Sequence, residues 1–386
     1  MKEVFVMHRK IALMLGMAVG FFNFVFILSE VMCADAPKPK IMFITTGGTI
    51  AHRENPDGSN SRIELTEVIN NIRARYPQPD VLALFESIKP SFKEVTLVGS
   101  SSLRLQDFLN IAWETQKALD QDFDAAIVTH GTTTSEDTCY FLNLLVNSRK
   151  PIVLTNSQRQ HLSVGNEGDR NLIDAIMVAT NRESNGKGAL LVEGAKIVAC
   201  REVLKNSDRP GAFLAQNLGV LGWLAGGTFS LEQREAVKYY REPARKHTFK
   251  SELSIKDIVN PDGTFKPLPR VEVLPSYYDA KPDVIDALVK LGVQGFVIHG
   301  LAPSGGIFRD QAPRLTELAK QGMPIVQTTR NAASYDAPVR ARPPFIGGDD
   351  LPSHKARILL QLAMKKTEQL TGSARRDQIQ QLFNTH

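Results

Sequence analysis

The stretch AAIVTHGTTTSEDTCYFLNLLVNSRKPIVL, residues 125–154, decides the fold. It begins with a short apolar run at 125–128, continues through a helical pattern at 135–146 and ends in a second apolar run at 152–154. A buried strand, a helix and another buried strand in this order are typical of a βαβ unit with parallel strands. The polar turn after the first strand therefore lies at the carboxyl end of that strand, where α/β proteins bind their ligands.

The same alternation extends along the chain in both directions. Before this stretch come a strand-like run at 41–45 and a helical face over 105–119, and after it a helix at 172–179 and strands at 189–192 and 196–199. A polar, proline-rich segment interrupts the pattern, which then resumes with strands at 270–274, 296–298 and 325–327 and helices at 282–291, 311–320, 353–363 (capped by Ser353) and 376–383. We therefore expect an α/β fold with a larger N-terminal parallel-sheet domain at 39–240, a linker at 241–269 and a smaller C-terminal α/β domain at 270–386.

Composition limits the classes of function. Hydrophobic residues make up 42% of the chain and charged residues 23%, which predicts a packed core. The formal net charge of +5 is spread along the sequence, so it gives no support to nucleic-acid binding. No His, Cys, Asp or Glu cluster has the spacing of a metal site, and we expect no metal.

The first residues have the pattern of a signal peptide. Lys2, Arg9 and Lys10 precede an apolar run at 11–28, and small residues follow up to Ala34. This order predicts that residues 1–34 form a secretory leader, with the protein in the periplasm, and an uncleaved membrane anchor is the alternative. After the leader only Cys139 and Cys200 remain, each in an apolar segment. Two buried free thiols are favoured over a disulfide between them.

Two turns rich in threonine follow predicted strands. The first is TTGGTIA, residues 45–51, in which Gly47 and Gly48 allow a sharp turn that presents Thr49 at the end of the sheet. Neither GxxxxGK[ST] nor GxGxxG is present, so a phosphate-binding loop is excluded. On these residues alone a purely structural turn is favoured over a catalytic one.

The second turn, at 129–137, has both a chemical and a structural interpretation. Thr133 and Glu136 have the spacing of a capping box, which gives Thr133 a structural role at the start of the helix. A satisfied core histidine is favoured over a catalyst for His130. Thr132 has no such explanation. Threonine needs a base to become a nucleophile, and Lys205, which follows another strand, is a candidate, with an ordinary surface lysine as the alternative.

In combination these motifs resemble a known family. Thr46-Gly47-Gly48-Thr49-Ile50-Ala51 resembles the first signature of the bacterial asparaginase/glutaminase family, and Val128-Thr129-His130-Gly131-Thr132 resembles the second. Further matches follow in order at 150–153, 244–248, 355–363 and 378–383. The similarity covers about residues 39–386 and is strongest to the exported, periplasmic type.

The resemblance implies a chemistry and a set of roles. Thr49 is expected to be the nucleophile that forms an acyl-enzyme with the side-chain amide of L-asparagine, or of L-glutamine, and releases ammonia. Thr132 and Lys205 are expected to activate the nucleophile or the water. Other expected substrate-binding residues are Gly48 and Gly131 (through backbone N–H groups on the oxyanion), Ser100, Ser101 and Thr133. The family uses no metal or organic cofactor, and its partners are the small amide and water. It typically forms a homotetramer, a dimer of tight dimers.

The sequence also departs from the family in the part that binds the α-amino end of the substrate. The aspartate that holds the α-ammonium group is replaced by Thr133, and residues 52–65, where a lid tyrosine is usual, contain no tyrosine. The residue that usually orients this tyrosine is replaced by Pro338. The segment 157–160 reads SQRQ in place of the usual AMRP, and a C-terminal asparagine is lost near Pro303-Ser304.

These departures leave three alternatives open. The protein is an asparaginase in which Glu54, Asp57, Glu167 or Asp169 supplies the missing charge, an amidase for a different small amide that lacks a free α-ammonium group, or a non-catalytic binding protein on the same scaffold. Because Thr49, Thr132 and Lys205 are all kept, an amidohydrolase is the leading hypothesis, with asparagine as its first substrate.

Overall fold

Strand β5 (Ala125–His130) is buried along its whole length because it is central to a mostly parallel sheet of eight strands. The computed structural model describes residues 37–386 except 56, 216–217, 225–236, 245–249 and 332–337. The strand order is β12-β11-β8-β7-β6-β5-β1-β4. The strands from β4 to β7 run parallel, and β8, β11 and β12 are added by antiparallel pairing. Their bounds are β1 Lys40–Thr45, β4 Lys89–Glu94, β6 Ile152–Asn156, β7 Ala189–Glu193, β8 Lys196–Ala199, β11 Val220–Leu224 and β12 Val237–Tyr239.

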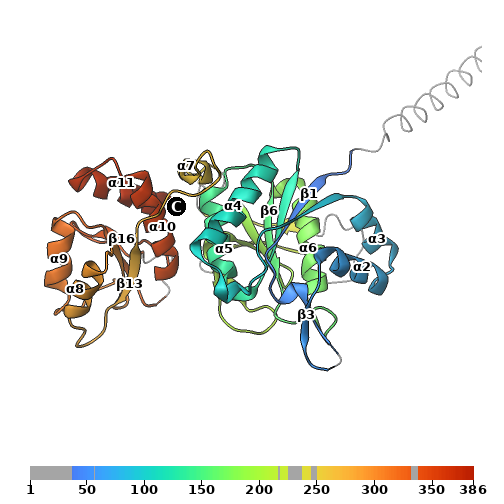
Figure 1. Cartoon of the computed structure of the whole chain (residues 1–386), viewed down its shortest axis with the longest axis horizontal. Coiled ribbons are helices and arrows are strands. Elements are labelled where there is room, and N and C mark those ends of the chain that lie inside the picture. Colours follow the sequence, from blue (N-terminus) through green and yellow to red (C-terminus); the bar gives the residue numbers. More distant parts are fainter. Residues whose placement is uncertain (1–36, 56, 216–217, 225–236, 245–249, 332–337) are drawn as a thin grey trace, which may run out of the picture. The chain divides into compact units, whose positions relative to one another are not determined.

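Helices cover both faces of this sheet. Helices α4 (Leu105–Asp120) and α5 (Ser135–Leu145) lie together beside the strands, and α2 (Leu65–Arg75), α3 (Pro79–Glu86) and α6 (Gly168–Thr180) lie on the other side (Figure 1). The apolar residues divide accordingly into two buried clusters, one with α4 and α5 and one with α2, α3 and α6. Burying apolar strand residues on both faces is what selects a parallel sheet for these sequences.

The C-terminal part repeats the βα pattern on a smaller scale. Its four-stranded parallel sheet has the order β13-β14-β15-β16, with bounds Val271–Pro275, Gly295–Gly300, Ile325–Thr329 and Ile346–Gly347. Four helices accompany it: α8 Asp283–Lys290, α9 Ala312–Lys320, α10 Ser353–Lys366 and α11 Gly372–Thr385. Helix α10 packs against β13 and β14 and also against α5, so a continuous apolar cluster joins the two sheets within residues 40–386.

The predicted domain limits stay a prediction. The segment 241–269 contains the short helix α7 (Ile255–Ile258), and residues 40–386 form one compact unit. The predicted leader at 1–34 lies outside the described residues, as does most of the family match at 244–248. Within the part of the chain that is described, no helix is long and apolar enough to cross a membrane.

Two local expectations need correction. Ser353 does not cap α10, because Pro352 occupies the cap position and the Ser353 hydroxyl bonds His299 Nδ1 at 2.6 Å. Thr133 does not cap α5 either. It lies in a 3₁₀ turn, Thr132–Thr134, and helix α5 begins after Thr134 with no side-chain cap. In both places a tertiary contact or a tighter turn replaces the local hydrogen bond that the sequence favours.

Candidate active site

Three segments of the N-terminal part meet where there is no room for a side chain. Gly48, at φ +83°, lies so close to the second turn that a Cβ atom on it would be 2.3 Å from the Cα of Gly131. A Cβ on Gly131 would in turn lie 2.7 Å from the hydroxyl of Ser100. The glycines of both threonine turns are therefore needed for this close approach, at the carboxyl ends of the neighbouring strands β1 and β5. Thr49 and Thr132 each follow one of the two glycines directly.

Thr49 begins a single 3₁₀ turn, Thr49–Ala51, and is half-buried. The carbonyl of Gly48 accepts hydrogen bonds from the Ala51 amide at 3.0 Å and from His52 Nδ1 at 2.7 Å. Residues that follow form a hairpin of β2 (His52–Glu54) and β3 (Asn60–Arg62), in the place where the resemblance predicts a lid. The turn that carries Thr49 is thus held by its backbone.

Thr132 has a charged partner. It is 7% exposed, and its hydroxyl accepts a hydrogen bond from Lys205 Nζ at 2.9 Å. Lys205 is the last residue of β9 (Val203–Lys205), which pairs only with β10 (Phe213–Ala215). The structure therefore brings together two residues 73 positions apart, as the hypothesis of a hydroxyl–amine pair requires.

Ser100 lies at the same junction and takes part in its hydrogen bonding. It is buried, its hydroxyl accepts the backbone N–H of Thr133 at 3.1 Å, and its carbonyl accepts the Thr134 hydroxyl at 2.8 Å. The Ser100 hydroxyl retains its own proton to donate. Ser101 and the side chain of Thr133 are exposed on either side of it.

His130 is a structural residue. It is fully buried, with Nδ1 2.6 Å from the Gly131 carbonyl and Nε2 2.8 Å from the Thr138 hydroxyl. Burial lowers its pKa from 6.5 to about 4, so the ring is neutral at physiological pH. The interpretation of His130 as a satisfied core histidine is confirmed.

Two residues that support the Thr132–Lys205 pair were missed in the sequence. Glu136 Oε2 accepts the backbone N–H of Lys205 at 2.9 Å, where the sequence had suggested a capping box. Lys355, on α10, is fully buried and donates to backbone carbonyls of the segment just before Lys205. The sequence does contain a sign of this role, because Lys355 is a lysine on a face of α10 that is mostly apolar.

The two cysteines are free and buried, as expected. Burial raises the pKa of Cys200 well above its ordinary value, and the neighbouring Cys139 thiol raises it further. The Cys200 thiol is therefore protonated in the folded chain.

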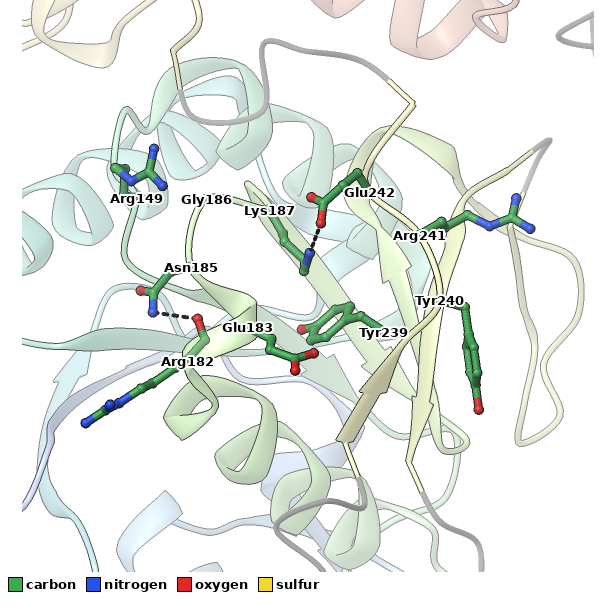
Figure 2. A pocket seen from close by; sticks show the side chains of 10 residues that line it. All are labelled: Arg149, Arg182, Glu183, Asn185, Gly186, Lys187, Tyr239, Tyr240, Arg241 and Glu242. Carbon is green, nitrogen blue, oxygen red and sulfur yellow. Dashed lines mark hydrogen bonds and ion pairs between the residues drawn. The ribbon is translucent and has the colours of Figure 1, made fainter.

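A cavity of about 630 Å³ lies away from these residues and contains none of the predicted site residues. Figure 2 shows the Lys187 ammonium beside the Glu242 carboxylate, at 2.6 Å, with the Tyr239 ring below it, while Arg182 and Arg241 extend away. The cavity residues come just before β6 and β7 and at the end of β12, so they do not lie at the carboxyl ends of the parallel strands. The buried cation of this cavity is thus already paired.

An α/β sheet with a glycine junction and a paired hydroxyl and amine at its carboxyl edge defines a class of protein that handles small polar molecules. Comparison with known proteins identifies the family. The family described as "Asparaginase, N-terminal" matches residues 40–237, and the "Glutaminase/Asparaginase C-terminal domain" matches residues 270–383. The chain belongs to the asparaginase family and is an L-asparaginase-like amidohydrolase.

Individual relatives agree with this assignment. L-asparaginase 2 of Escherichia coli is 30% identical over 354 residues, which cover 90% of this chain and 93% of that protein. A probable periplasmic L-asparaginase of Haemophilus influenzae is 29% identical over 86% of this chain and 90% of its own length. The crystal structure of a probable cytoplasmic L-asparaginase from Campylobacter jejuni has a TM-score of 0.74 and 28% identity, and covers 90% of this chain and all of that one.

Proposed function

We propose that this chain hydrolyses L-asparagine, or L-glutamine, through a covalent acyl-enzyme on Thr49. The observation that carries the proposal is the 2.9 Å contact between Lys205 Nζ and the Thr132 hydroxyl, at the glycine junction that also presents Thr49. A second threonine, Thr132, whose hydroxyl is bonded by the Lys205 amine, can serve in proton transfer. Such a group is needed because a hydroxyl must lose its proton to attack the amide or to activate water.

The proposed reaction has two steps, formation of the acyl-enzyme and its hydrolysis. The Thr49 Oγ attacks the amide carbon and gives its proton to a base. The negative oxygen that forms is stabilised by backbone N–H groups beside Gly48 and Gly131. The C–N bond then breaks, and the nitrogen leaves as ammonia with the transferred proton. In the second step Thr132 and Lys205 take a proton from water, the hydroxide attacks the ester carbon, and Thr49 leaves with its proton restored. Ser100, aided by Ser101, is proposed to donate to the substrate carboxylate.

The partners of the acidic residues limit which of them can replace the family aspartate at the α-ammonium group. Asp169 is occupied, with Oδ1 2.8 Å from His161 Nδ1 and Oδ2 3.6 Å from Arg75. Asp57 accepts both the amide and the hydroxyl of Ser59 in the β2–β3 hairpin, and Glu54 is exposed on the same hairpin.

Glu167, like Asp169, has a buried carboxylate oxygen with no hydrogen-bond partner among the described residues. Oε1 of Glu167 accepts the backbone N–H of Gln158, and its Oε2 is the oxygen without such a partner. It lies just before α6, in the loop that follows β6, the strand next to β5. Among the four acids we therefore propose Glu167 as the one that binds the ammonium group, because its loop follows the strand next to β5.

A different amide without a free α-ammonium group is the second candidate substrate. It is favoured by the exposed threonine at position 133, because a neutral hydroxyl does not replace the charge of a carboxylate. A binding protein without turnover is the third candidate.

Ammonia release separates the three candidates. We would measure it with L-asparagine, L-glutamine and N-acylated or deaminated amides, on the wild-type chain and on Thr49→Ala. The proposal expects asparagine turnover that disappears in the variant. Thr49-dependent turnover of only the N-acylated or deaminated amides supports the second candidate. A small polar ligand that raises the melting temperature without ammonia release would leave only a binding protein.

We also infer export and assembly. The basic, apolar and small residues of 1–34 support a cleaved signal peptide and a periplasmic protein, and the resemblance supports a homotetramer. Mass spectrometry of the protein from a periplasmic extract tests both, since it gives the first residue and the native mass. A chain that starts at Met1 in the membrane fraction would contradict the cleaved leader.

A further inference from the structure

Lys355 is a buried lysine that the proposed reaction does not use. Its side chain is fully buried, and no carboxylate of the described residues lies within ion-pairing distance of its ammonium group. Three backbone carbonyls accept from it instead, those of Cys200 at 3.3 Å, Arg201 at 2.7 Å and Val203 at 2.5 Å. The Tyr140 ring lies 5.7 Å away. Removing an ammonium group from water is costly, and only several good hydrogen bonds offset the cost.

The three carbonyls belong to the segment that carries Lys205. Cys200–Glu202 form a 3₁₀ turn, and Val203 begins β9, which ends at Lys205. Strand β9 lies outside the eight-stranded sheet and pairs with β10 over only three residues. Such a short two-stranded ladder is marginal by itself, so the position of Lys205 depends on other contacts.

Those contacts come from two sides. On one side, Glu136 of α5 accepts the Lys205 backbone N–H at 2.9 Å, and the Thr132 hydroxyl accepts a hydrogen bond from Lys205 Nζ at 2.9 Å. On the other side, α10 supplies Lys355 to the carbonyls before it. The catalytic amine is thus set between two helices, one from each half of the chain.

We propose that Lys355 is a positioning residue for amide hydrolysis, which holds the 200–203 backbone so that Lys205 Nζ stays within hydrogen-bond distance of Thr132. This inference rests on the role proposed for Lys205. A displacement of a reacting group by about 1 Å can cost about 100-fold in rate. We expect Lys355→Met to lower kcat by about 10- to 100-fold and to change KM little, because Lys355 does not contact the substrate.

A purely structural role for Lys355 is the competing explanation, and α10 offers a matched control. Arg357 lies two residues further along, is half-buried, and donates from Nε to the Val271 carbonyl at 2.8 Å. Like Lys355 it is a cation bound to a backbone carbonyl, but its partner is in β13 and not in the 200–205 segment. Arg357→Met should therefore lower the melting temperature without lowering kcat.

The experiment uses the full chain with Lys355→Met, Lys355→Gln, Lys355→Arg and Arg357→Met. Two quantities are measured on each folded variant: kcat and KM from ammonia release, and the rate at which trace acetic anhydride labels Lys205, mapped by mass spectrometry. We expect Lys355→Met to lower kcat and to change Lys205 labelling relative to other lysines, Lys355→Arg to restore part of both, and Arg357→Met to change neither. Lys355→Gln keeps two N–H donors and serves where Lys355→Met does not fold.

Two results would overturn the proposal. One is unchanged Lys205 labelling in every folded Lys355 variant. The other is a loss of kcat that follows the loss of melting temperature equally in Lys355→Met and Arg357→Met. Labelling needs no turnover. A wild-type chain without amide hydrolysis but with Lys355-dependent Lys205 labelling would thus refute the proposed reaction and leave the positioning contact established.

Discussion

The two threonine turns have similar sequences but differ in how the chain holds them. Thr132 is almost completely buried, and Lys205 bonds its hydroxyl, with Glu136 and Lys355 holding the backbone around Lys205. Thr49 is half-buried, and its hydroxyl makes no hydrogen bond with the described residues, although His52 holds the carbonyl before it. In the proposed mechanism the Thr132 hydroxyl transfers a proton and the more exposed Thr49 hydroxyl attacks the substrate carbonyl. The different surroundings of the two hydroxyls support these two proposed roles.

The largest effect on activity is expected when the amine that bonds the Thr132 hydroxyl is removed. Lys205→Met keeps most of the side-chain volume but removes the proton acceptor. It should lower kcat/KM by about 10²- to 10⁴-fold, the usual contribution of a general base. Ammonia release gives the rate, and circular dichroism checks the fold. Full activity in a folded Lys205→Met protein would mean that Thr132 is not organised for catalysis.

The next largest effect is on stability, when alanine replaces a glycine at the junction. We expect Gly48→Ala to destabilise the fold more than Gly131→Ala does. Gly48→Ala places a Cβ at 2.3 Å from backbone atoms and at φ +83°, so the backbone itself must move. Gly131→Ala meets the Ser100 hydroxyl at 2.7 Å and the Ser100 Cβ at 2.9 Å, and its nearest backbone atom is farther away, at 3.2 Å, so a shift of one side chain relieves most of the clash. We expect Gly48→Ala to lower the free energy of unfolding by about 3 kcal/mol or more and Gly131→Ala by about 1–2 kcal/mol.

Urea unfolding measures both glycine variants, and Gly99→Ala is the control. Gly99 adjoins Ser100, has φ −58°, and has open space where a Cβ would be added. Equal losses for all three alanine variants would show that the two turns do not meet as described.

Asp137, partly buried in the first turn of α5, has a cost in stability that depends on pH. Burial, and then the neighbouring Glu136 charge, raise the pKa of Asp137 from 3.8 to about 6. The folded chain therefore binds this proton more tightly than the unfolded chain, so the contribution of Asp137 to stability is largest below pH 4 and is lost as the pH rises through about 6. Asp137→Asn removes this loss and should gain about 1–3 kcal/mol over the wild type at pH 7. Unfolding at pH 4 and pH 7 measures it, and a gain that is the same at both pH values would contradict the raised pKa.

The smallest predicted effect is on the KM for substrates with and without an α-ammonium group. Glu167→Gln should raise KM for L-asparagine about tenfold, equivalent to about 1.4 kcal/mol, if Glu167 binds the α-ammonium group. KM for an N-acylated amide should stay the same, and Asp57→Asn serves as the control on the hairpin. A KM for asparagine that does not change in Glu167→Gln would favour an amide without an ammonium group as substrate.

Most of the fold could be predicted because its strands are continuous apolar runs with regular helices between them. Strand β4 was missed because it is an edge strand with mostly exposed, polar residues, KPSFKE, and so lacks the apolar signal. The hairpin of β2 and β3 was missed because its residues are polar and its strands have three residues each. The start of α6 was placed four residues late, because the polar first turn gives no apolar period.

For the candidate site, the sequence predicted the residues that belong to recognisable motifs. Thr49 and Thr132 follow strands and Lys205 ends one, and this placement at strand ends is readable from sequence. Glu136 and Lys355 were not found, because their importance lies in backbone groups that they reach only in the folded chain. The role of Thr133 as a helix cap was wrong, since the Ser100 hydroxyl binds the Thr133 amide and α5 begins later. The segment 335–337 beside Pro338 lies outside the described residues.

The most direct test of the central claim is to trap the acyl-enzyme and locate it. The wild-type chain would be mixed with L-asparagine, with an N-acylated or deaminated amide in parallel, quenched in acid during turnover, digested and examined by mass spectrometry. We predict an acyl adduct on the peptide that contains Thr49, absent in Thr49→Ala, in which ammonia release also stops. An adduct on Thr132, or continued turnover by the Thr49→Ala protein, would contradict the assignment of Thr49 as the nucleophile.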